Sequence, residues 1–293
     1  MDGLLYVDKP AGITSHDVVA IVRRAARSKR VGHAGTLDPF ATGLLVLAVG
    51  SCTRLLPYVL GEPKVYEAVI RFGAETDTDD SAGEVTAERA MPDLSNASVL
   101  HRAMASLTGD IDQQPPDYSA KHVDGKRAYD LARRGVQFSL APVRVTVHGW
   151  SVVAVEPDRI AVRVTCGGGT YVRALARDLG RALDTAAHCY ALRRIASGPA
   201  RVDDAVGLAG LRPGSIADGE VVLQSPLPAL GDIAHEELDA AALHELSHGR
   251  AIPASAAGAR AALLQGGRVV AIANRTGDDR WQPKVVLLGA STS

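Results

Sequence analysis

The sequence lacks the features that mark membrane, secreted and metal-binding proteins. It has no run of 18 apolar residues, and residues 1–3 begin no signal peptide, so we expect a cytoplasmic protein. Its three cysteines, Cys52, Cys166 and Cys189, have no metal-ligand spacing, which indicates isolated thiols in a reducing compartment. Its glycine-rich segments lack the spacings of phosphate loops and dinucleotide-binding motifs. We therefore expect neither a cofactor nor a metal.

Aromatic residues are also few, and the net charge is close to zero. Aromatic residues make up 4% of the 293 positions and hydrophobic residues 46%, so aliphatic side chains should fill the core of about two domains. The net charge is −1, but residues 1–60 carry seven Lys/Arg against four Asp/Glu, and residues 115–177 carry ten against five. Such local basic faces can follow a phosphate backbone even when the total charge is near zero.

The acidic residues gather in residues 75–93, which hold seven Asp/Glu and one Arg. Within this stretch, residues 75–83 look superficially like a calcium loop. They lack the alternating Asp order and the bidentate Glu of such a loop, so we expect a solvated acidic turn.

One segment, Gly32–Leu45, organises the rest of the chain. Its glycines, threonines and proline predict a loop, and the apolar residues from Leu44 to Val49 predict a buried strand after it. Pro39 disfavours a helical conformation at Asp38, so we expect this carboxylate at the tip of the loop. An isolated Asp before Pro is most often a turn residue or a helix cap. His33, five residues earlier in the same loop, favours a functional role.

The remaining pattern predicts several strands and few helices. After Pro199 the composition turns acidic, with eleven Asp/Glu and seven Lys/Arg in residues 203–293, and we place a domain boundary near residues 225–231. The expected strands are Leu4–Asp8, Lys64–Phe72, Val143–Val155, Arg159–Thr165, Ala261–Leu264, Val269–Ala273 and Pro283–Leu288. The expected helices are His16–Ala26, Leu94–Leu107 and Leu238–Leu246.

Two basic segments allow two interpretations each. A basic insert at about residues 115–141, with Tyr118 and Tyr129, suits a nucleic-acid clamp, since stacking contributes about 1–3 kcal/mol per base. It could equally be a surface hairpin without a ligand. The five Lys/Arg within residues 23–30 could contact phosphates or could form a solvated helix end, where cations suit the helix dipole.

The segment Gly32–Leu44 resembles the nucleophile loop of the bacterial TruB-type tRNA pseudouridine synthases. It carries all nine fixed residues of the family pattern Gly-His-x-Gly-x-Leu-Asp-Pro-x-Ala-x-Gly-Leu. Three more segments match: Lys9–Ser15 (Lys-Pro-x-Gly-x-Thr-Ser), Lys64–Tyr66 (Lys-x-Tyr) and Gly169–Arg173 (Gly-Thr-Tyr-x-Arg). Relatives often have a lysine where Gly168 stands, so one cation expected near the RNA is absent here.

The resemblance implies roles for individual residues. It makes Asp38 the catalytic nucleophile, pairs Arg173 with it, and places Tyr66 in the active site, stacked on the target base. The residues that it assigns to substrate binding are Lys9, His33, Tyr171 and Leu192. For Leu192, an ordinary place in the core is an almost equal alternative.

The chemistry of this family needs such residues. Pseudouridine formation breaks the N1–C1′ bond of a uridine, turns the base and joins C1′ to C5, with no oxidation and no cofactor. A carboxylate acts as nucleophile at C6 of the base or at C1′ of the ribose. Burial raises the pKa of a carboxylate from about 3.9, and a guanidinium such as that of Arg173 opposes the rise. Flipping the base out costs a few kcal/mol, which contacts from Tyr66 and Tyr171 can partly offset.

The resemblance implies an α+β fold, with a mixed, largely antiparallel central sheet, flanking helices and a small β-rich PUA-like C-terminal domain. We expect the catalytic domain at residues 1–228 and the PUA-like domain at residues 229–293. The implied activity is isomerisation of uridine 55 in the T-loop of tRNA by a monomer that contacts the T-arm stem-loop. The alternative is a non-catalytic RNA-binding or tRNA-folding module. A carboxylate-based hydrolase is disfavoured because no second catalytic acid is evident.

Overall fold

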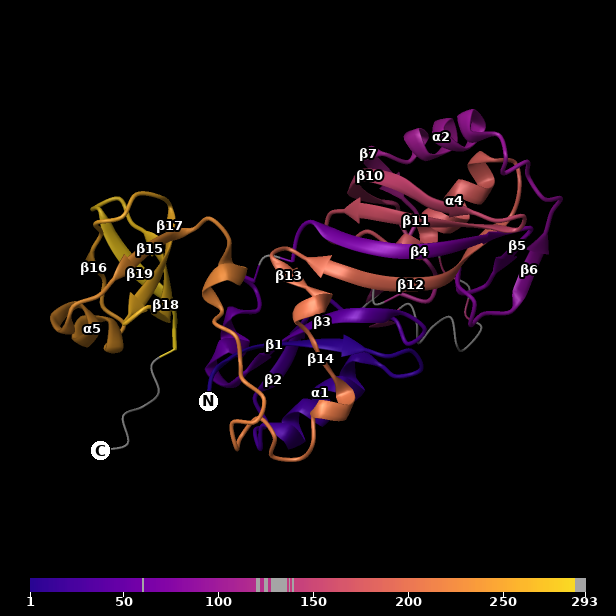
Figure 1. Ribbon diagram of the computed structural model, residues 1–293. Helices are drawn as coiled ribbons and strands as arrows, with labels where there is room; N and C mark the ends of the chain where they lie inside the picture. Colours follow the sequence, from indigo (N-terminus) through magenta and orange to yellow (C-terminus); the bar gives the residue numbers. More distant parts are fainter. Residues whose placement is uncertain are drawn as a thin grey trace.

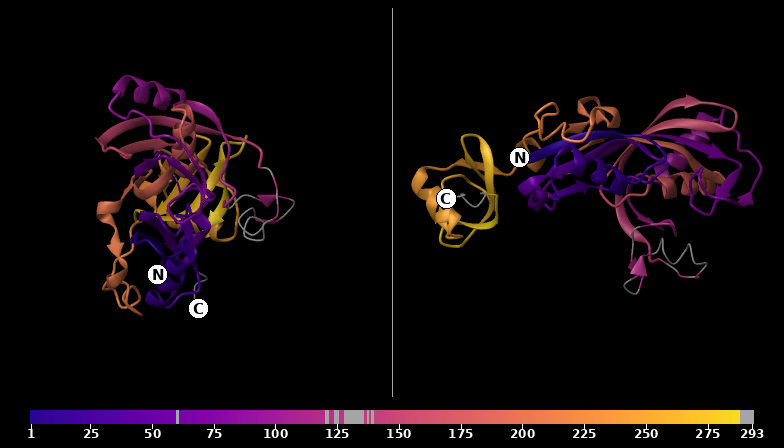
Figure 2. Two further views of the ribbon diagram at one scale, coloured as in Figure 1. Left: turned by 90° about the vertical axis from the view of Figure 1, so that its right-hand side faces the viewer. Right: turned by 90° about the horizontal axis from the view of Figure 1, so that it is seen from below.

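The computed structural model describes residues 1–59, 61–119, 122–123, 126–127, 136, 138 and 140–287. A ten-stranded sheet occupies most of the chain, and a five-stranded sheet lies beyond it toward the C-terminus (Figure 1). The two sheets follow one another along the length of the molecule (Figure 2). In the part of the chain described here, no helix is long and apolar enough to span a membrane.

The large sheet is mixed and mainly antiparallel. Only the β1–β14 and β3–β12 pairs run parallel among its described strands. The predicted α+β class with a largely antiparallel central sheet is thereby confirmed. In spatial order its main strands are β14 (Val206–Gly207), β1 (Gly3–Lys9), β3 (Thr42–Val49), β12 (Ala187–Ser197), β4 (Lys64–Phe72), β11 (Arg159–Cys166), β10 (Val143–Val155) and β7 (Gly109–Gln113); β2 (Val31–Ala34) pairs with β3, and β13 (Ala200–Arg201) with β12.

The apolar run of β3 is buried on both faces of the sheet, as its composition predicted. Side chains alternate along a strand, so Leu45 and Leu47 point to one core and Leu44 and Val46 to another. The first core also contains Leu175 of the helix that follows the 169–173 segment. The second core reaches the C-terminal sheet. Burial on both faces fixes the end of the Asp38 loop, because neither face of β3 can turn toward solvent without loss of apolar contacts.

Helices α1 (Ser15–Ala25) and α2 (Ala97–Ser106) begin after residues whose side chains cap free backbone N–H groups. Thr14 accepts a hydrogen bond from the N–H of Asp17, and the Asp17 carboxylate accepts one from the N–H of Thr14. This capping box starts α1 where it was predicted. Helix α2 begins later than the predicted Leu94, because Asn96 is its cap. Helix α4 (Val172–Ala182) follows the glycine-rich segment and packs on the large sheet (Figure 1).

The prediction of a loop at Gly32 and His33 is wrong. Residues Val31–Ala34 form β2, in which His33 lies opposite Leu47 of β3. The apolar β3 offers backbone hydrogen bonds to this short segment, and that pairing outweighs the low strand preference of glycine. The strand ends at Ala34 and is followed by Gly35, whose φ of 79° is in the left-handed region that favours glycine. The loop that carries Asp38 is therefore shorter than the sequence suggested.

The C-terminal sheet is small and β-rich, as predicted. Trp281 is fully buried in its core. Leu264 and Ile272 pack in one cluster with Leu44 and Val46 of the large sheet. The sequence indicated three of its strands and its helix but missed β15 and β16. The elements in spatial order are β15 (Ala234–Glu237), β17 (Arg260–Gln265), β18 (Arg268–Arg275), β19 (Arg280–Val286) and β16 (Ile252–Pro253), with α5 (Ala240–Ser247) beside them.

Candidate active site

Segments that are far apart in the sequence line one cavity of about 220 Å³. The loop before β3, the start of β4, the start of α4 and the middle of β12 all contribute to it. It brings together five of the seven residues that the sequence selected: Asp38, Tyr66, Tyr171, Arg173 and Leu192. Lys9 and His33 do not line it. Lys64, which the sequence analysis quoted only as part of a motif, does.

Asp38 and Arg173 form a two-point ion pair. The Arg173 Nε lies 2.9 Å from Oδ2 of Asp38, and Nη2 donates a hydrogen bond of 3.2 Å to Oδ1. The side chain of Asp38 is 37% exposed, whereas that of Arg173 is 4% exposed. A planar guanidinium can orient both carboxylate oxygens at once. The carboxylate is therefore held in one direction while it stays accessible from the cavity.

The remaining nitrogen of the Arg173 guanidinium is also engaged. Nη1 donates to the carbonyl of Thr78 at 2.6 Å and lies 3.4 Å from Oδ2 of Asp80. Nη2 also donates to the carbonyl of Tyr118 at 3.0 Å. With these partners and Asp38, the guanidinium is fixed from several sides. Arg173 therefore holds the Asp38 carboxylate in one orientation.

The prediction of a solvated acidic turn at residues 75–83 is right for the exposed Asp77 but wrong for Asp79 and Asp80. Asp79 and Asp80 are 7% and 5% exposed, and Asp79 lies 2.7 Å from Nη1 of Arg177. Residues four apart on a helix share one face, so Arg173 and Arg177 of α4 both meet this turn. Burial raises the pKa of Asp79 to about 6, and the Arg177 guanidinium opposes that rise. The turn is therefore part of the support behind Asp38.

Replacing Arg177 with methionine is expected to lower the free energy of unfolding by about 3–5 kcal/mol, because Asp79 would remain buried without its cation. Asp79 has a folded-state pKa of about 6, above its ordinary 3.8, so its contribution to stability decreases as pH rises through that window. The loss should thus be smaller near pH 5, where Asp79 is protonated, than near pH 8. Urea denaturation at the two pH values measures the difference.

Arg102 of α2 supplies the control, because its side chain is exposed and forms no ion pair with a described residue. Its replacement by methionine should change the free energy of unfolding by less than about 0.5 kcal/mol. If Arg177→Met lowers the free energy of unfolding by no more than Arg102→Met does, the ion pair between Arg177 and Asp79 has no structural role.

Tyr66 lines the cavity, and the unpredicted Arg194 lies beside it. Tyr66 is 7% exposed; burial raises the pKa of its hydroxyl, and the Arg194 guanidinium opposes the rise. Arg194 is 1% exposed and donates from Nε to the carbonyl of Leu44 at 2.7 Å and from Nη2 to the carbonyl of Gly35 at 3.0 Å. It therefore ties β12 to both ends of the Asp38 loop. The sequence gave no sign of this role, because Arg194 stands next to a second arginine. Only the structure distinguishes the two, since Arg194 is buried and Arg193 is half-exposed.

Tyr171 and Leu192 lie at the cavity from two other elements. The backbone N–H of Tyr171, at the start of α4, donates to Oε1 of Gln113 at 2.8 Å, and the Gln113 amide donates to the carbonyl of Tyr171 at 3.1 Å. Burial raises the pKa of the Tyr171 hydroxyl. Leu192 on β12 is 7% exposed and is both a core residue and a lining residue. The two interpretations of Leu192 therefore do not exclude each other.

Lys9 and His33 lie outside the cavity wall. Nζ of Lys9 donates to the carbonyls of Pro10, Ile13 and Pro39 at 2.9, 2.9 and 3.3 Å. Burial lowers the pKa of Lys9 to about 8. In this conformation Lys9 braces the residue that follows Asp38.

His33 contacts His16 edge to face, with 5.7 Å between ring centres, and its pKa is lowered by burial and by His16. It therefore faces the start of α1 and not the carboxylate of Asp38.

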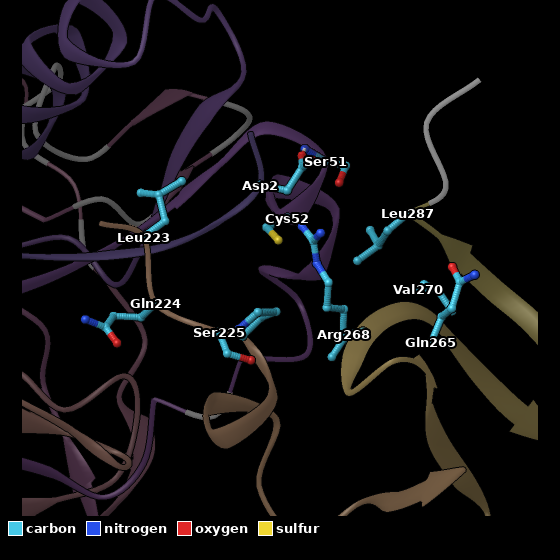
Figure 3. A pocket seen from close by; sticks show the side chains of 12 residues that line it. Asp2, Ser51, Cys52, Leu223, Gln224, Ser225, Gln265, Arg268, Val270 and Leu287 are labelled. Carbon is cyan, nitrogen blue, oxygen red and sulfur yellow. Dashed lines mark hydrogen bonds between the residues drawn. The ribbon is translucent and has the colours of Figure 1, made fainter. Parts of the chain in front are cut away.

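A larger cavity of about 430 Å³ lies between the two sheets (Figure 3). Asp2 and Cys52 face it from the large domain, and Arg268 faces it from the C-terminal sheet. Burial raises the pKa of the Cys52 thiol to about 11, which keeps it in the unreactive protonated form at neutral pH. The lining contains no residue that the sequence selected, so the smaller cavity is the candidate active site.

Comparisons with known proteins show the family of the chain. The model of the TruB family pseudouridylate synthase (N terminal domain) matches residues 23–172. The tRNA pseudouridine synthase B of Thermobifida fusca (strain YX) is 44% identical over 299 residues, covering 99% of this chain and 99% of its own length. That of Arthrobacter sp. (strain FB24) is 45% identical over 262 residues, covering 87% of this chain and 84% of its own.

A solved structure matches the fold over almost the whole chain. A chain of the crystal structure of a Cbf5–Nop10–Gar1 complex has a TM-score of 0.72 and 23% identity, covering 98% of this chain and 85% of that one. At this identity the match concerns the fold alone, which includes the PUA-like C-terminal domain. The family model and the two bacterial relatives lead to one conclusion. The chain belongs to the TruB family of pseudouridylate synthases.

Proposed function

We propose that this chain isomerises uridine to pseudouridine in tRNA, with Asp38 as the nucleophile. The observation that supports it best is the accessible Asp38 carboxylate, held at two points by the buried Arg173. The relatives with 43–45% identity are named tRNA pseudouridine synthase B. A fixed and accessible carboxylate is what an attack on C6 of the base or on C1′ of the ribose needs.

The other lining residues suit a base that has left its stack. Tyr66 and Leu192 provide an apolar and aromatic wall, against which a uracil ring can pack. Tyr171 closes the side next to Arg173. The pair of electrons of the N1–C1′ bond stays on the base when the bond breaks. After C5 bonds to C1′, C5 loses its proton, N1 takes up a proton, and the bond between Asp38 and the substrate breaks, which restores the free carboxylate. The isomerisation is then complete without any external group.

We propose uridine 55 in the T-loop of tRNA as the target, read through the shape of the T-arm stem-loop and its splayed bases. Lys9 and His33 would contact the RNA in the bound state. The exposed Arg24, Lys29 and Arg30 at the end of α1 suit the phosphate backbone. Most of the predicted basic insert at residues 115–141, with Tyr129, lies outside the described residues.

We further propose a monomer in the cytoplasm. Its catalytic domain would be residues 1–228 and its PUA-like domain residues 229–293. The three free, buried cysteines are in keeping with a reducing compartment.

Pseudouridine has the mass of uridine, so the test needs a chemical readout. A T-arm stem-loop RNA labelled with tritium at C5 of its uridines is incubated with the full chain. The proposal predicts release of the tritium of one uridine per RNA into water. If the RNA binds but releases no tritium, the proposed activity is wrong, and the chain is a non-catalytic RNA-binding or tRNA-folding module.

A further inference from the structure

Lys64 brings a positive charge into the candidate active site that no partner neutralises. It is the first residue of β4, and its side chain lines the cavity together with Tyr66, two residues later. Alternate residues of a strand point to the same face, so the ammonium and the tyrosine ring reach the cavity side by side. Within the described residues, Lys64 has no hydrogen bond and no ion pair.

A second cation stands next to Lys64. A Cβ built on Gly35 would lie 3.5 Å from Nη1 of Arg194 and 3.7 Å from Nζ of Lys64, so both groups border the same small space. Arg194 donates hydrogen bonds to the backbone carbonyls of Leu44 and Gly35, and it forms no ion pair with a described carboxylate. Burial and the Arg194 guanidinium lower the pKa of Lys64, with burial the larger cause.

The ion pair between Asp38 and Arg173 does not neutralise the positive charge of Lys64 and Arg194. The carboxylate of Asp38 is matched by Arg173, which also meets Asp80. The nearby carboxylate of Glu62 attracts Lys64 electrostatically and opposes the lowering of its pKa, but within the described residues it forms no ion pair with it. Lys64 and Arg194 therefore leave this side of the cavity positive. Buried cations without a partner are costly to a fold, and they are tolerated where an anion forms during function.

The proposed isomerisation forms such an anion. When the N1–C1′ bond breaks, its electron pair remains on the uracil, and the negative charge spreads over the ring and its two carbonyl oxygens. When C5 then bonds to C1′, the C5 proton leaves and N1 takes up a proton. The base is therefore most negative while it is detached from the ribose, and a nearby donor would stabilise it most at that stage.

We propose that Lys64 donates a hydrogen bond to a carbonyl oxygen of the target uracil and stabilises the detached, negatively charged base. This inference rests on the proposed function. Arg194 reinforces the positive potential from behind. The position of Lys64 beside Tyr66, on the same face of β4, favours the base as its partner over the phosphate of the flipped nucleotide.

The test is single-turnover tritium release from the stem-loop RNA by the Lys64→Met variant of the full chain. Loss of one preorganised donor should lower the rate of the chemical step about 100-fold. The affinity for the RNA, measured by filter binding, should change by no more than about threefold, because the interaction forms mainly in the transition state. Lys64→Arg, which keeps the charge and a donor, should restore much of the rate, and this rescue separates the role of the charge from a failure to fold.

The matched control is Lys284, an exposed lysine of β19 in the C-terminal sheet. The Lys284→Met variant should release tritium at the wild-type rate. Loss of RNA affinity in Lys64→Met with an unchanged rate at saturation would overturn the proposal in favour of a phosphate contact. A wild-type rate in Lys64→Met would overturn it outright and leave the proposed function intact. If the wild type itself releases no tritium, the proposed function fails first.

Discussion

Replacing Asp38 with asparagine is expected to lower the rate of pseudouridine formation by about 10⁴-fold or more, as is usual when a nucleophile is lost. Asparagine has nearly the same shape and can still accept a hydrogen bond from Arg173, but its amide cannot form the bond to the base or to the ribose. The affinity for RNA should stay within about threefold of the wild type. Tritium release and filter binding measure the two quantities, and Asp38→Ala serves as a second variant.

Asp158 offers a close control for this change. It pairs with Arg71 at 3.0 Å, and its side chain is 34% exposed, close to the 37% of Asp38, but it lies in the turn between β10 and β11. Asp158→Asn should therefore keep the wild-type rate. If Asp38→Asn also turns over normally, Asp38 is not the nucleophile, and the proposed mechanism must be abandoned.

Replacing Arg173 with lysine is expected to lower kcat about 100-fold or more, with a much smaller change in KM. Lysine keeps the charge, but a single ammonium cannot bind both oxygens of Asp38 and also reach Thr78, Tyr118 and Asp80 as the guanidinium does. The carboxylate would turn away from its productive direction, and misplacement of a reacting group by about 1 Å can cost 100-fold.

The matched control lies two turns later on the same helix. Arg181 forms a two-point pair with Glu75, with contacts of 2.9 and 2.8 Å, but its side chain is 57% exposed and lies away from the cavity. Arg181→Lys should leave kcat and KM unchanged. Melting temperatures of both variants show whether the fold survives. If the fall in kcat of Arg173→Lys is fully explained by a lower melting temperature, Arg173 has no positioning role. An equal fall in the kcat of Arg181→Lys would mean the same.

Much of the fold could be predicted because its signals are local. The capping residues Thr14 and Asp17 mark the start of α1, and the alternating and apolar patterns mark β3, β4 and β10. Such signals depend on residues within a few positions of each other. Short strands such as β15 carry too few residues for a periodic pattern, and β2 forms only because β3 provides the neighbouring edge.

For the candidate site, the sequence by itself determined which side chains are available, and the resemblance of its motifs to the family implied the pairing of Asp38 with Arg173, more than a hundred positions away. Only the tertiary structure decided the surroundings of that pair. It buried Asp79 and Asp80 against α4, turned Lys9 to backbone carbonyls, and left Lys64 unpaired beside Arg194. The physical reason is that the charge, burial and hydrogen bonds of a side chain depend on neighbours that folding brings together, whereas its chemical identity is fixed by the chain alone.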